Sequence, residues 1–373
     1  MFKKYIFILL FLFIQSCKND SYSDLIDDKV VLHLKFNAYN TATNNDARVG
    51  LEWALSQIGA QNINISFNGI LQDENKFTIN YLNLGFNVNA KEQLEKLHQK
   101  IKNSQAYKQN NNIDLGRYIA LIIGVSEHYY KITNVPKEIT NILENYNLET
   151  NKGYIDNSLV SNKHRILEYS KQNGLKQLFL TTEVEPITQE ILEYETIEIM
   201  DNGQLRYGIF DVEGIRKNSA TPNISNAGKP AKCMWCHESK ISRLFSPQGN
   251  KDGFLSYLQL KDTLTTYYNQ LNQKQLQLSN GVNFGETQEH TKMELLYISF
   301  MEPSAQVLSK EWNLSVAEVQ NRLQSLDTHT YDEFPFLGNL YHRNEVVQFA
   351  PFTSLRVSSS IREQSQLEVN HID

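Results

Sequence analysis

Cysteine is scarce in this sequence, with three residues among 373, and that scarcity excludes a small fold held together by many disulfides. Basic residues are also few, since 36 lysines and arginines stand against 42 aspartates and glutamates and leave a net charge of −6. Such a chain presents no basic field to phosphates, so we expect no nucleic-acid partner. Hydrophobic residues make up 40% of the chain, which is enough for a buried core.

A long apolar run is missing as well, although a short one stands near the N-terminus. Lys3 and Lys4 precede residues 5–14, which are all aliphatic or aromatic. The run falls short of the ~20 residues that a membrane-spanning helix needs. The arrangement therefore predicts a secretory signal peptide, with an uncleaved membrane anchor as the alternative.

The first cysteine directly follows this run. Residues 14–17 end in Ser16 and Cys17 and resemble the bacterial lipobox, in which a small residue precedes the cysteine that becomes acylated. The resemblance implies a signal peptide over residues 1–16 and a lipid anchor on Cys17 that holds the protein to the bilayer of the cell envelope. Residues 17–28 are polar and acidic and predict a tether. The sequence leaves open which membrane face carries the protein.

The other two cysteines lie in one pentapeptide, Cys233-Met234-Trp235-Cys236-His237. Two thiols three positions apart can reach the two vinyl groups of a porphyrin, and the adjacent imidazole can then bind the iron. The stretch resembles the haem-attachment motif of c-type cytochromes. The resemblance implies one covalent haem c per chain, held by Cys233 and Cys236 with His237 as an axial ligand. It covers five residues and implies no cytochrome c fold.

Two other interpretations of the same residues stay open. Cys233 and Cys236 could form a disulfide in an oxidising compartment, although so tight a loop is often strained. They could instead supply part of a zinc site with His237, but no second C-x-x-C or H-x-x-x-H pair offers the remaining ligands. Haem is attached to such motifs outside the cytoplasm, so the haem interpretation agrees with the predicted export.

Hydropathy patterns predict an α+β fold in two regions. Residues 29–215 mix strand alternation with helical stripes, which predicts a region of β-hairpins and helices whose role the sequence does not reveal. Residues 216–373 predict a mostly helical region that bears the haem motif.

Three local patterns allow sharper predictions. Asn202 and Gly203 form a turn pair that predicts a hairpin between residues 196–200 and 205–210. Residues 164–172 predict a helix that ends before a glycine. Ser315 and Glu318 together predict a capping box at the start of another helix; it covers residues 316–323.

The axial ligand opposite His237 decides what the haem does. The resemblance implies a downstream methionine, and Met293 is the first candidate, with Met301 as the second. His290, His329 and His342 are imidazole alternatives, and the position could also hold no protein ligand.

We therefore expect a monohaem c-type lipoprotein that transfers single electrons to a redox partner protein in the cell envelope. Two alternatives remain: a haem enzyme of a peroxidase-like kind, and an envelope binding or sensor protein with a structural haem. A strong second axial ligand predicts the electron carrier, whereas an open position predicts the enzyme. Whether the protein is an enzyme is thus undecided by the sequence.

Overall fold

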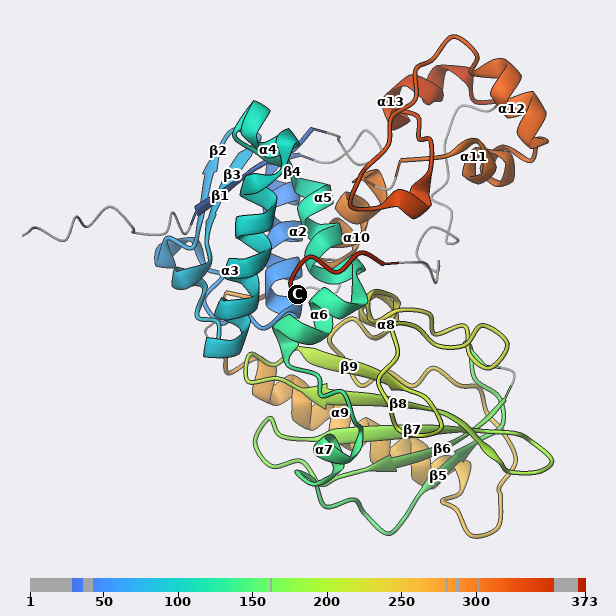
Figure 1. The fold of residues 1–373 in the computed structure, drawn as a ribbon. Helices are drawn as coiled ribbons and strands as arrows, with labels where there is room; N and C mark the ends of the chain where they lie inside the picture. The colour runs from blue at the N-terminus through green and yellow to red at the C-terminus, as the bar shows by residue number, and fades with distance from the viewer. Residues whose placement is uncertain are drawn as a thin grey trace, which may run out of the picture.

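The computed structural model describes residues 29–35, 43–161, 163–278, 281–285, 289–300, 302–351 and 368–373. Two sheets and many helices confirm the predicted α+β fold, and the helices after residue 216 confirm its helical second region (Figure 1). The predicted signal peptide, the tether with Cys17, and Met301 lie outside the described residues.

The first sheet has four strands in the order β2-β3-β1-β4. Alternation puts Val30 and Leu32 on its buried face, as a half-buried strand requires. β1 pairs antiparallel with β3 and parallel with the short β4. The strands are β1 (Lys29–His33), β2 (Ile70–Asp73), β3 (Lys76–Asn80) and β4 (Ile113–Asp114).

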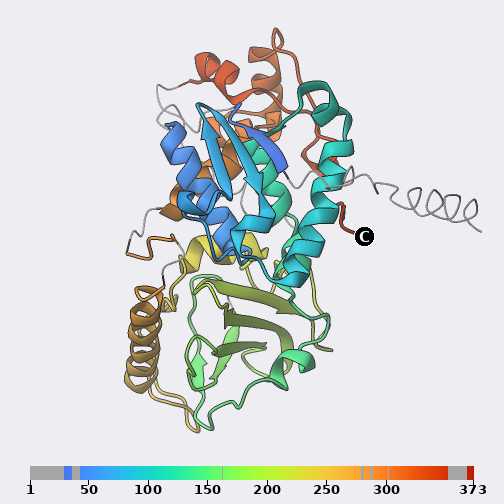
Figure 2. The same ribbon diagram turned by 90° about the vertical axis from the view of Figure 1, so that its left-hand side faces the viewer.

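Helices pack beside this sheet and contribute many residues to the main apolar core (Figures 1 and 2). Thr43 starts the first of them with a capping box that it forms with Asp46. The helices are α2 (Asn44–Gln57), α3 (Val88–Asn103), α4 (Gln105–Asn110), α5 (Leu115–Ile119) and α6 (Ser126–Thr133), and a π-helical turn, η4 (Ala120–Gly124), joins α5 to α6.

The second sheet is an antiparallel meander in the order β5-β6-β7-β8-β9. Its last hairpin turns at Asn202 and Gly203, and Gly203 has a φ of +83°, so the predicted hairpin is confirmed. The strands are β5 (Gly153–Ile155), β6 (His164–Tyr169), β7 (Leu178–Val184), β8 (Ile191–Ile199) and β9 (Leu205–Phe210).

The helix predicted over residues 164–172 is wrong, because this segment begins with strand β6. β6 is hydrogen-bonded along both sides, to β5 and to β7. The apolar spacing of Ile166, Leu167 and Tyr169 is compatible with either element when the sequence is taken alone. Pairing with two neighbouring strands decides the outcome, since it satisfies the backbone groups of the segment on both edges.

Two helices lie against the second sheet. α8 (Pro230–His237) contacts β9, and α9 (Tyr257–Gln275) places Tyr267 against Tyr169 and Phe179. Figure 2 shows α9 running along one side of the sheet. α10 (Glu289–Phe300) then returns to the first sheet's helices and packs on α2 and α5, so it joins the two regions that the sequence divides at residue 215. A short helix, α7 (Thr140–Leu143), precedes β5.

The last helices form a small group with its own apolar cluster, which stands apart in Figure 1. Ser315 and Glu318 form the predicted capping box there. The group consists of α11 (Ala305–Trp312), α12 (Val316–Arg322) and α13 (Arg343–Val346). None of the described helices has both the length and the apolar character that crossing a bilayer demands.

Candidate haem-attachment site

The C-x-x-C-H residues occupy the last turns of α8. Pro230 suits the first helical position because its missing N–H has no partner there in any case, and the helix ends where Glu238 takes a left-handed φ of 51°. Cys233, Cys236 and His237 stand at positions i, i+3 and i+4 and therefore share one face of the helix. The fold thus presents both sulfurs and the imidazole on the same side.

The other sides of α8 fix the helix to the core. Met234 is fully buried, and the Trp235 ring packs 5.2 Å, between centroids, from the ring of Tyr297 on α10. α8 also contacts α6 and η4. A helix held in this way gives its donor-bearing face a defined direction, toward β9.

His237 lies against the sheet. Its ring centroid is 6.0 Å from that of Tyr207 on β9, and its Nδ1 atom is buried without a hydrogen bond of normal geometry. Burial lowers the pKa of His237 to about 4, although the nearby main chain of Lys240 acts in the opposite direction. The imidazole is therefore neutral at neutral pH, which is the form that binds a metal.

Cys233 faces a polar part of the same sheet. Burial raises the pKa of its thiol far above the ordinary value, Glu195 raises it further, and Arg165 acts to lower it. Its Sγ atom lies 3.7 Å from the carbonyl oxygen of Lys229. Cys233 and Cys236 are not joined to each other by a disulfide, so the interpretation of the motif as a disulfide finds no bond here.

A cluster of buried charges lies beside the thiol, and the sequence analysis missed it. The guanidinium of Arg165 forms ion pairs with Glu183 and, at 3.4 Å, with Glu195. Arg165 pairs with Glu183 in register and Glu183 pairs with Glu193, so these side chains emerge from one face of the sheet. A signal was present in β8, because alternation aligns Glu193 and Glu195 with the apolar Ile197.

The residues at the end of α8 and their surroundings have the chemistry that a haem requires. The two sulfurs and the imidazole match the group in type and spacing. Three polar atoms beside them are buried without a hydrogen-bond partner, namely His237 Nδ1, Tyr207 Oη and Arg165 Nε. Buried polar groups normally have partners, so these atoms are available to a bound group. The chemistry of the donor set and its surroundings therefore fits a haem.

The methionine expected as the opposite axial ligand lies on α10. Met293 is fully buried on α10, which meets α8 through the contact of Tyr297 with Trp235. Trp235 and His237 are two positions apart and so point roughly 200° apart around a helix of 3.6 residues per turn. The contact that Tyr297 of α10 makes with α8 is therefore on the side of the helix away from His237.

The histidine alternatives are also engaged at other places. His329 and His342 stack with ring centroids 4.2 Å apart in the loop before α13, next to Glu302. The side chain of His290 lies outside what the structure describes. Of the described imidazoles, the motif histidine is the one that neighbours the two cysteines.

Comparison of the chain with protein-family models, with curated proteins and with solved structures gives no match.

Proposed function

We propose that this protein carries one haem c, bonded to Cys233 and Cys236 and ligated by His237, and that it transfers single electrons in the cell envelope. The observation that carries the proposal is the placement of all three donors on one face of α8. When bound, the haem supplies iron that changes its charge by one electron.

The chain's own residues have definite tasks in this proposal. Tyr207 packs against the ring of His237 and limits its rotation, while Met234 and Trp235 hold the helix in place from the opposite side. The main chain of Lys240 acts on the imidazole of His237 and would help to orient it. Arg165 supplies a buried positive charge near the thiols.

Location and partners complete the proposal. Acylation of Cys17 attaches the protein to the bilayer, and the tether over residues 17–28 separates the fold from the lipid. The electrons then pass to or from a redox partner protein in the same compartment. The export that the N-terminal sequence predicts agrees with both features, because lipid attachment and haem attachment each take place after secretion.

One observation favours a second candidate, a haem enzyme or sensor with an open axial position. Tyr297 of α10 meets α8 on the side away from His237, and His329 and His342 stack on each other beside Glu302. An iron with one protein ligand would bind carbon monoxide or cyanide readily and would give a high-spin spectrum. The electron carrier predicts a low-spin spectrum that these ligands change slowly or not at all.

The test is to produce the exported chain together with haem-maturation machinery and to measure the mass of the purified protein. We expect the mass of the lipidated chain plus one haem, and a reduced-minus-oxidised spectrum of haem c. The double variant Cys233→Ala/Cys236→Ala should lose the covalent haem, whereas Cys17→Ser should lose the lipid and keep the haem. A wild-type mass without porphyrin would disprove the proposal.

A further inference from the structure

A second group of metal-binding side chains lies outside the haem motif. Glu302 follows α10, and His329 pairs with Leu340 through two main-chain hydrogen bonds of 3.0 and 2.9 Å. Tyr341 donates its N–H to the carbonyl oxygen of Pro303 at 3.0 Å. These hydrogen bonds hold together three segments that are distant in the sequence. The backbone therefore brings the side chains of Glu302, His329 and His342 close to one another.

The donor atoms of this group are close to one another. Nε2 of His329 is 2.7 Å from Oε2 of Glu302, and Nδ1 of His342 is 3.3 Å from the same oxygen. All three ligand atoms lie within 4.8 Å of one another. Zinc bonds of ~2.0–2.1 Å in a tetrahedron separate the donors by roughly 3.3 Å, so the present spacing is near that of a bound ion.

The two rings need one adjustment to bind a common ion. They are stacked with an interplanar angle of 17°, so their lone pairs run nearly parallel rather than toward one point. The side chain of His342 is 39% exposed and has room to turn, whereas Glu302 is fully enclosed. A small rotation of His342 would direct its nitrogen toward the other two donors.

Charge supplies a separate argument for a cation. The described ion-pair partners of Glu302 are the two histidines, and the guanidinium of Arg343 is already bound to Glu311 at 2.7 and 3.1 Å. The N–H of Arg343 donates to Oε1 of Glu302 at 3.0 Å but brings no full charge. A buried carboxylate without a permanent counter-charge is unfavourable.

Other groups near Glu302 also favour a cation beside its carboxylate. Burial raises the pKa of Asp114 to about 6, and Glu302 is close enough to contribute to that rise. The proposed ligand atom of His329, Nε2, is buried without a hydrogen bond of normal geometry, and so is its Nδ1 atom. The surroundings of Glu302 therefore combine excess negative charge with unused nitrogen donors.

We propose that Glu302, His329 and His342 bind one divalent first-row transition-metal ion, such as Zn²⁺. Two imidazoles with one carboxylate select such ions over Mg²⁺ and Ca²⁺, which prefer oxygen donors. Three protein ligands leave at least one position for water or another ligand, as in catalytic zinc sites.

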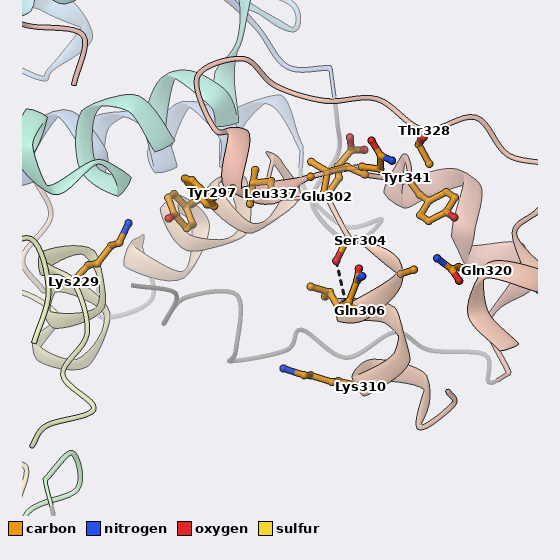
Figure 3. Close-up of a pocket in the computed structure, with 16 residues that line it drawn as sticks. Lys229, Tyr297, Glu302, Ser304, Gln306, Lys310, Gln320, Thr328, Leu337 and Tyr341 are labelled. Atoms are coloured by element: carbon orange, nitrogen blue, oxygen red, sulfur yellow. Dashed lines mark hydrogen bonds between the residues drawn. The ribbon is translucent and has the colours of Figure 1, made fainter. Parts of the chain in front are cut away.

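A cavity lies next to this group of side chains. Glu302 lines a cavity of about 650 Å³ together with Ser304, Gln306 and Lys310 (Figure 3). The cavity lies between α10 and the last helical group, and Tyr341 stands on its wall.

The inference is tested on the purified full-length chain after treatment with a chelator. Calorimetric titration with Zn²⁺ should show one ion per chain, and Co²⁺ should give visible absorption bands of a nitrogen- and oxygen-bound ion. Glu302→Gln and His329→Gln should each weaken binding at least about 100-fold, because changes that only touch a ligand's neighbours already cost about 10–100-fold. His33→Gln, which changes a partly buried histidine on β1, should leave binding unaltered.

Two results would contradict the proposed metal site. Absence of Zn²⁺ binding to the wild type, or equal binding by the Glu302→Gln and His329→Gln variants, would overturn the inference. If those variants fail to fold by circular dichroism, His342→Gln carries the test, because its side chain is partly exposed. Native mass spectrometry distinguishes an added zinc ion from an added haem, so the result does not depend on the haem proposal.

Discussion

The buried histidine of α3 offers a quantitative test of the fold. His98 is 3% exposed and lies between Tyr81, whose ring meets it edge-on, and Tyr118, whose hydroxyl is 2.8 Å from Nε2. Burial lowers the pKa of His98 from 6.5 to about 3, and Lys102 contributes in the same direction. In the unfolded chain the same imidazole should titrate near its ordinary value of ~6.5.

The sign and size of the effect follow from this difference. Because the folded pKa is the lower one, the unfolded chain takes up more protons in acid, and the stability contributed by neutral His98 is complete only above ~pH 6.5. It is lost as the pH falls toward the folded pKa of about 3. Between about pH 7.5 and about pH 5 the free energy of unfolding should fall by about 2 kcal/mol on account of this residue.

Urea unfolding at these two pH values measures the effect. The variant His98→Gln removes the titrating group, so its free energy of unfolding should depend on pH less steeply than that of the wild type by about 2 kcal/mol. The contributions of the other titrating groups to the pH dependence cancel in this comparison, because both proteins contain these groups. His33→Gln, at a less buried position, should retain most of the wild-type dependence. An equal pH dependence of wild type and His98→Gln would refute the reasoning.

Substitutions at three further positions test a packing contact, a buried ion pair and a helix cap. Trp235→Ala removes the contact with Tyr297 and should lower the free energy of unfolding in urea by about 3–5 kcal/mol. The measurement uses haem-free protein, so that the loss of packing is observed by itself. Glu311→Ala removes the carboxylate that pairs with the buried guanidinium of Arg343 and should cost about 3–5 kcal/mol; a loss below about 1 kcal/mol in the same assay would contradict the buried pair. Ser315→Ala removes the cap of α12 and should cost about 1 kcal/mol, which Ser315→Gly should largely restore.

Local chemistry made several elements predictable. The turn at Asn202 and Gly203 needs a residue with positive φ, and glycine supplies it wherever the hairpin lies in the fold. The capping box of Ser315 and Glu318 likewise uses only groups within one helical turn. Such patterns keep their meaning because the interacting atoms are neighbours in the chain.

The prediction of a helix at residues 164–172 was wrong because the conformation of this segment depends on residues that are distant in the chain. Its conformation depends on strands β5 and β7, whose hydrogen bonds the segment completes on both sides. The sequence of the segment does not by itself specify which strands it pairs with. The same dependence on distant partners hid the charge cluster around Arg165, because Glu183 and Glu195 reach it from two other strands.

The sequence by itself determined the α+β class and the C-x-x-C-H pentapeptide, since composition, periodicity and short spacing are all properties of neighbouring residues. Only the tertiary structure decided which face of α8 meets the sheet, which side chain of α8 meets Tyr297 of α10, and that Glu302 meets His329 and His342. These relations arise from packing between segments far apart in the chain. Burial and backbone pairing, which a linear pattern does not specify, bring such segments together.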